Sequence, residues 1–220
     1  MTRATRIAIT LLTLPGLLLA AGVAQAHPHA WIDLQVTLER DADGRITHMR
    51  HQWRFDPTYG QYLYDDAQQH QPGTSADQRL QGLAREIHAN LAEYDWYSHV
   101  EADAAPIAVK ADGDPAMARE DDLLFLRFRL ALEEPVDPAA AALRYRVYDP
   151  TYFIEILHEE AGGTRILEAS GLAAADCHAE RTRPRPDPAM VARAIALDYG
   201  ASAEYDLGKH FAERITVRCG

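Results

Sequence analysis

Two histidines separated by one proline, His27-Pro28-His29, are the residues of this chain best suited by type and spacing to metal chemistry. They follow the Ala-Gln-Ala of residues 24–26, which is typical of a signal-peptidase site. Cleavage after Ala26 would free the α-amine of His27. That amine and two imidazoles would supply three nitrogen donors of the kind that zinc, nickel, cobalt and copper bind.

The residues before this site predict export. Arg3 and Arg6 give a short positive start, and the apolar stretch 7–23 is broken by a Pro-Gly pair at 15–16. This stretch is too short and interrupted for a comfortable membrane span, although a retained N-terminal anchor is the alternative. We therefore expect residues 1–26 to be a signal peptide, and residues 27–220 to form one domain without a stable membrane anchor.

Pro28 limits how a metal can bind at this terminus. It has no amide hydrogen, so binding through a deprotonated amide of the second residue is excluded. What remains is ligation by the side chains of His27 and His29, or a brace in which the α-amine of His27 joins the two imidazoles. The competing interpretation is a flexible, exposed terminus that happens to carry two histidines.

A predicted hairpin brings further ligands toward this segment. Residues 31–39 alternate, with apolar side chains on one face and Trp31 and Asp33 on the other, and residues 46–55 form a second strand. A register centred near Ala42 pairs Trp31 with Trp53 and Asp33 with His51. His51 and Asp33 would then share the face that carries the N-terminal histidines.

The remaining patterns predict a mainly β, α+β fold with a sandwich-like antiparallel core of about seven short strands. Two helices are expected, at 75–95 and 189–199. Further strands are expected at 124–132, 143–149, 153–158, 164–168, 178–182 and 211–219.

The string Asp-Pro-Thr-Tyr occurs twice, at 56–59 and 149–152. In the structural interpretation, each Asp carboxylate accepts hydrogen bonds from turn amides and each Pro fixes the next φ angle. In the functional interpretation, Asp56 and Asp149 are equivalent positions, one or both facing a metal.

Composition excludes some functions and leaves the cysteines with two roles. The net charge of −11 makes nucleic-acid binding a poor expectation. The sequence has no helical zinc-protease motif, nucleophile elbow, phosphate loop or dinucleotide fingerprint, so we do not expect an enzyme. In an exported chain, Cys177 and Cys219 are expected to form one disulfide; the alternative is a metal site of Cys with His178.

Three separated motifs resemble the family called domain of unknown function 1007. They are His-Pro-His-Ala-Trp-Ile-Asp at 27–33, Arg-His-Gln-Trp-Arg-Phe-Asp at 50–56 and Val-Tyr-Asp-Pro-Thr-Tyr-Phe at 147–153. The cysteines and the ending at 211–219 also fit. Members are exported bacterial proteins, often labelled as the periplasmic component of an ABC-type transport system and associated with nickel/cobalt-type permeases. The resemblance therefore implies a periplasmic role in transition-metal handling.

These observations predict a periplasmic protein that captures a divalent transition metal and supports a membrane metal permease or ABC-type transporter. The expected ligands are His27, His29 and His51, with Asp33 or Asp149 completing the site. Trp31, Trp53 and Tyr152 are expected to wall it off, with Asp56 nearby. The alternatives are a non-metal accessory module of a permease and, more remotely, a copper-dependent oxidative enzyme built on a histidine brace.

Overall fold

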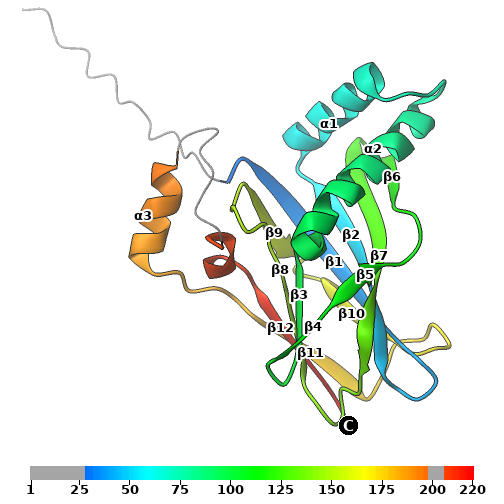
Figure 1. Cartoon of the computed structure of the whole chain (residues 1–220), viewed down its shortest axis with the longest axis vertical. Coiled ribbons are helices and arrows are strands. Elements are labelled where there is room, and N and C mark those ends of the chain that lie inside the picture. The colour runs from blue at the N-terminus through cyan, green and yellow to red at the C-terminus, as the bar shows by residue number, and fades with distance from the viewer. Residues whose placement is uncertain (1–27, 198–205) are drawn as a thin grey trace, which may run out of the picture.

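The computed structural model describes residues 28–197 and 206–220, which form two packed sheets with three α-helices (Figure 1). The predicted signal peptide, His27 and the last residues of the helix predicted at 189–199 lie outside the described residues. The strands are β1 Ala30–Arg40, β2 Ile46–Phe55, β3 Ser98–Ala102, β4 Ala105–Ile107, β5 Val109–Ala111, β6 Ala116–Glu120, β7 Leu123–Val136, β8 Leu143–Val147, β9 Ile154–His158, β10 Thr164–Leu167, β11 Cys177–Thr182 and β12 Arg214–Cys219. The helices are α1 Pro57–His70, α2 Ala76–Leu91 and α3 Pro188–Ala196, with 3-10 turns η1 Ala92–Tyr97 and η2 Gly208–His210.

Strand β1 is central to the larger, seven-stranded sheet. It pairs antiparallel with β2 on one edge, and on the other edge it pairs parallel with β9 along its first half and with β10 along its second half. The sheet continues from β2 to β7, which also pairs with β5 and β6. The sheet is therefore mixed, whereas the sequence predicted an antiparallel core.

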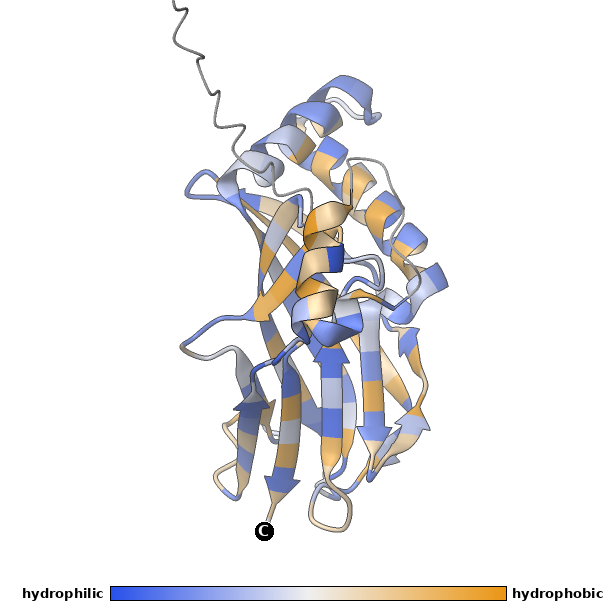
Figure 2. Ribbon diagram, turned by 90° about the vertical axis from the view of Figure 1, so that its left-hand side faces the viewer, coloured by the Kyte–Doolittle hydropathy of each residue, from blue (hydrophilic) through white to orange (hydrophobic). Residues whose placement is uncertain are grey.

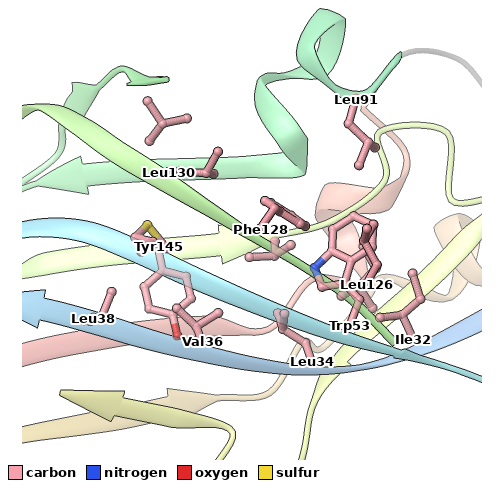
Figure 3. Close-up of a cluster of buried hydrophobic side chains, with 14 of the residues drawn as sticks. Ile32, Leu34, Val36, Leu38, Trp53, Leu91, Leu126, Phe128, Leu130 and Tyr145 are labelled. Carbon is pink, nitrogen blue, oxygen red and sulfur yellow. The ribbon is translucent and has the colours of Figure 1, made fainter. Parts of the chain in front are cut away.

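The smaller sheet is antiparallel, in the order β11-β12-β8-β3-β4, and it faces the larger sheet across an apolar core. Figure 3 shows side chains of β1, β2 and β7 meeting Tyr145 of β8 in this core. Trp53 and Tyr145 are the largest side chains that are almost completely buried. Hydropathy alternates along the strands, as a half-buried sheet requires (Figure 2). The predicted α+β fold with a sandwich-like core is confirmed.

The predicted faces of β1 and β2 are confirmed, but the predicted hairpin register is wrong. Trp53 pairs with Leu34 rather than with Trp31, a shift of three residues. The Asp41 carboxylate closes the turn by accepting hydrogen bonds from the backbone amides of Asp43 and Arg45. Strand β1 therefore continues to Arg40, where its pairing with β2 has a bulge. A shift by an odd number moves every side chain of β2 to the other face.

Helix α1 was not predicted, although its start carries strong local signals. The Asp56 carboxylate caps the helix and a proline follows at its first position, an arrangement that favours helix initiation. Only Gly60, Leu63 and Ala67 are buried, so the apolar stripe that usually reveals a helix is weak.

None of the helices in the described part of the chain is long and apolar enough to cross a membrane.

Helix α2 ends earlier than predicted, and the backbone then adopts left-handed conformations. The helix stops at Leu91, and Asp95, Trp96 and Tyr97 then take positive φ angles of 51°, 49° and 59°. Such angles are uncommon for residues other than glycine and are costly for bulky side chains. The ring of Tyr97 stacks on Trp53 at 6.1 Å, so core packing compensates part of this cost.

A disulfide joins Cys177 to Cys219, as expected. The two residues are directly paired in register between β11 and β12, and the bond closes a segment in which they are 42 positions apart. The Cys-plus-His alternative is thereby excluded, because both sulfur atoms are used. The bond is consistent with an oxidising compartment.

Replacing both cysteines by serine should lower the free energy of unfolding by about 4 kcal/mol, because the unfolded chain regains the freedom that the closure removes. Urea unfolding under non-reducing conditions measures this difference. Reductant should destabilise the native protein by a similar amount and leave the double variant unchanged. Equal stability of the two proteins without reductant would show that the bond adds nothing.

Candidate metal site at the start of strand β1

His29 is held by the fold. Its backbone amide donates to the carbonyl of Phe153 at 2.8 Å, and its imidazole lies against the Phe153 ring with centroids 4.8 Å apart. Pro28 is buried and His29 is half-buried. The interpretation of a flexible terminus therefore does not apply to His29.

The two Asp-Pro-Thr-Tyr turns flank this segment. Trp31 donates its amide to Asp56 Oδ2 at 3.1 Å and accepts from the Asp56 amide at 2.9 Å. On the other edge, Ala30 pairs with Ile154, whose amide is bound by Asp149 Oδ2 at 3.0 Å. The start of β1 is thus hydrogen-bonded on both edges to segments that the two aspartates organise.

The structural interpretation of the repeated string is confirmed for both aspartates. Asp56 Oδ1 accepts the amides of Thr58 and Tyr59, and Asp149 Oδ1 accepts both the amide and the hydroxyl of Thr151. Asp149 is only 3% exposed, so these hydrogen bonds offset the cost of burying its charge. The Asp149 carboxylate therefore already accepts hydrogen bonds within the turn in the absence of a ligand.

Tyr97 approaches Asp149 from η1. Burial raises the pKa of the Tyr97 hydroxyl, and the neighbouring Asp149 carboxylate raises it further. The phenol is therefore neutral at physiological pH and can donate a hydrogen bond to Asp149.

Trp31 and Tyr152, two of the predicted wall residues, are connected by a carboxylate that the sequence did not single out. Glu155 accepts a hydrogen bond from Trp31 Nε1 at 3.0 Å and another from the Tyr152 hydroxyl at 3.2 Å. The Tyr152 ring stacks on Phe211 at 4.0 Å. Glu155 became a neighbour of Trp31 through the parallel pairing of β1 with β9, which no local pattern in the sequence indicates. Trp53, in contrast, is in the core.

The structure separates His51 from Asp33, so the predicted four-residue arrangement is not formed. His51 is completely buried between the sheets, stacked on Phe128 at 4.7 Å, with Nε2 3.4 Å from Ser98 Oγ. Burial lowers the pKa of His51 to about 3, and the neighbouring His158 contributes, so its imidazole is neutral. Asp33 lies on the outer face, where it forms an ion pair with Arg54 at 2.6 Å.

Within residues 28–197 and 206–220, no three His, Cys, Asp or Glu side chains are grouped so that they could hold a metal ion. Among the predicted ligands in the described structure, His29 is the one that lies beside the predicted cleavage site. A metal site here would need donors from His27.

A buried polar network that sequence analysis missed joins the two sheets. His158 Nδ1 lies 3.0 Å from Glu213 Oε2, and His158 Nε2 lies 3.2 Å from the Tyr145 hydroxyl, which contacts Thr164 Oγ1 at 2.8 Å. Because a carboxylate can only accept here, His158 Nδ1 carries a proton and donates to Glu213. The residues come from β8, β9, β10 and the segment before β12, and their contacts depend on how these segments pair and pack, so no local motif signals the network.

The charge on Glu213 is stabilised in this network. Burial alone would raise the pKa of Glu213, but hydrogen bonds from the ring and amide of His158 and the charge of Arg181 outweigh burial, so the pKa is lowered. The folded state therefore binds a proton less readily than the unfolded chain, and the stabilisation is present above the unfolded pKa of Glu213.

The geometry defines an α+β sandwich whose central strand begins between two aspartate-capped turns and carries a fixed histidine at its start. The chain belongs to the family described as "Protein of unknown function (DUF1007)", whose model matches residues 12–219. A protein of Haemophilus influenzae described as "Uncharacterized protein" is 27% identical over 209 residues, which cover 93% of this chain and 96% of that protein. Neither description states an activity.

The lowered pKa of Glu213 predicts how the stability of the protein depends on pH. Stability should fall as the pH drops below the unfolded pKa of Glu213 and through its lowered pKa in the folded state, and Glu213→Gln should show a smaller loss over the same range. At pH 7 this variant should be less stable by about 1–3 kcal/mol, the usual cost of losing a charged, buried hydrogen bond. Urea unfolding between pH 3 and pH 7 measures both effects. The exposed Glu101→Gln variant is the control, and a Glu213→Gln profile parallel to that of the native protein would refute the assignment.

Proposed function

We propose that this protein is exported to the periplasm, binds a divalent transition metal at its mature N-terminus and supports a membrane metal transporter. The observation that carries the proposal is the fixed position of His29. A histidine two residues from a predicted cleavage site is hydrogen-bonded through its backbone to Phe153 and packed against its ring. Preorganising one ligand lowers the conformational entropy that metal binding must overcome.

The proposed ligand set is smaller than the one predicted from the sequence. His27 and His29 supply two imidazoles, and cleavage after Ala26 adds the α-amine of His27. His51 is left out because it lies in the core, and Asp33 is left out because it forms an ion pair on the outer face. Asp149 is also left out of the first coordination sphere, because its oxygens already bind Thr151 and Ile154.

A site of three nitrogen donors fits a carrier. Structural zinc sites are closed by four protein ligands, whereas sites with an open position keep a place for water or another ligand. Here the open position would admit a donor from the transporter during transfer. Imidazole and amine donors suit zinc, nickel, cobalt and copper, so the ligand types leave the choice among these metals open. Binding, rather than catalysis, is the activity that we propose.

The environment of the segment supports metal capture. Glu155 and Asp149 lie on the strand and turn beside β1, and the whole chain has a net charge of −11. Negative charge raises the local concentration of cations and speeds their association. Trp31, which is 48% exposed, provides an optical reporter next to the site.

Calorimetric titration of the mature protein, produced without any residue before His27, tests the proposal. Zinc, nickel, cobalt and copper ions should be tried in turn, and at least one should bind with a stoichiometry of one. His29→Ala should weaken binding by about 100-fold or more, because loss of a direct ligand exceeds the effect of removing an outer-sphere partner. The exposed His70→Ala variant on α1 is the matched control and should bind like the native protein.

A variant with one alanine added before His27 tests the amine separately. If the α-amine is a ligand, this extension should weaken binding while both imidazoles remain. Unchanged affinity in the His29→Ala variant would overturn the proposed site. A metal-independent accessory role at a permease would then be the better account.

A further inference from the structure

The outer face of the smaller sheet carries a second candidate site. A cavity of about 280 Å³ is lined by residues of β3, β8 and β12 and of the η2 turn. Figure 1 shows where these elements lie in the fold. It is small compared with typical ligand pockets, so it would fit a small molecule. Its polar lining includes the basic residues His99, Arg144, Arg146, Lys209 and Arg214, the acidic residues Glu101 and Asp206, and Tyr148.

The strand register explains why the arginines converge. Arg144 and Arg146 are two positions apart on β8, so both project from the outer face, opposite to the buried Tyr145. Ile215 pairs with Tyr145, which places Arg214 of β12 beside Arg146 on that outer face. Arg146 also pairs directly with His99 of β3.

Three arginines and Lys209 line this cavity together with two carboxylates, Glu101 and Asp206, so its lining carries an excess of positive charge. In the part of the chain that the structure describes, Arg144, Arg146 and Arg214 form no ion pair. Asp206 is already engaged, because it accepts from the Tyr148 hydroxyl at 2.8 Å and pairs with Lys209 at 3.1 Å. In a chain of net charge −11, a cluster of cationic side chains in one cavity indicates a local function.

His99 adds an unused polar atom to the cavity. Its ring stacks on Tyr148 with centroids 4.3 Å apart, and its Nε2 atom is buried without a hydrogen-bond partner in the described residues. Buried polar atoms are normally satisfied, so an unsatisfied one beside a cavity indicates a missing ligand or water. Imidazole can donate a hydrogen bond from this atom to an anion.

The wall of the cavity is fixed by close backbone packing. Gly208 donates its amide to the Pro150 carbonyl at 3.2 Å, and a Cβ atom at position 208 would lie only 1.9 Å from the carbonyl oxygen of Asp149. Only glycine fits there. This contact fixes the turn that carries Asp206 and Lys209 beside the arginines, so the site is organised before a ligand binds.

We propose that this cavity binds a small multivalent oxyanion, such as inorganic phosphate or a di- or tricarboxylate, through Arg144, Arg146 and Arg214. Guanidinium groups bind the oxygens of carboxylates and phosphates in pairs, which suits a site built from several arginines. Lys209 and His99 would supply further donors. The cavity is not lined by His27 or His29, so this proposal can be tested independently of the proposed metal site.

Calorimetric titration of the oxidised mature protein in metal-free buffer of low ionic strength tests this proposal. Phosphate and citrate are the probes, and chloride at equal ionic strength is the control for general screening. At least one probe should bind saturably with a stoichiometry of one. Arg146→Gln and Arg214→Gln should each weaken binding by about tenfold or more, because each removes a charge-assisted hydrogen bond.

Arg218→Gln is the matched control. Arg218 lies on β12, four residues after Arg214 and on the same face of the sheet, but it does not line the cavity. This variant removes the same charge and should leave binding unchanged within about twofold, while thermal unfolding should show that all three variants are folded. A preference for citrate or phosphate would identify the ligand class. Absence of saturable binding by both probes, or equal weakening by Arg218→Gln, would overturn the proposal.

Discussion

The hydrogen bonding at the start of β1 is the constraint on which the rest of the structure depends. The Trp31 amide donates to the Asp56 carboxylate and the Trp31 carbonyl accepts from the Asp56 amide, while His29 and Ala30 are bound to the segment after Asp149. These contacts fix where β1 begins, and β1 in turn pairs with β2, β9 and β10. The same contacts fix the position of His29, the histidine that we propose as a metal ligand.

The segment 148–152 connects the two proposed sites. Its Asp149 organises the strand beside His29, its Tyr148 lines the basic cavity, and its carbonyls at 149 and 150 contact Gly208. Positive φ angles at Tyr97, Tyr152 and Asp206 concentrate backbone strain around this segment. Strain of this kind persists when the surrounding packing fixes it, and it is found often at functional sites.

The sequence predicted the strand faces and most strand positions because alternation and turn residues are local signals. The correct register follows from the apolar stripes: Ile32 and Leu34 must share a core with Trp53 and Phe55, which the predicted register places on the opposite face. The partners of β9 and β10, the Glu155 link and the His158–Glu213 pair could not be predicted, because they depend on contacts between distant segments. Helix α1 lacked an apolar stripe, although its Asp-Pro cap was a usable signal.

The central claim is that the mature N-terminus forms a metal site against the turns that flank β1. Anomalous X-ray diffraction from crystals of the mature protein loaded with the metal that binds in solution tests this most directly. The account predicts one strong peak within bonding distance of imidazole nitrogens of His27 and His29, about 2.0–2.1 Å for zinc. A strong peak at other residues, with His29 still packed on Phe153 and no metal beside it, would contradict the account.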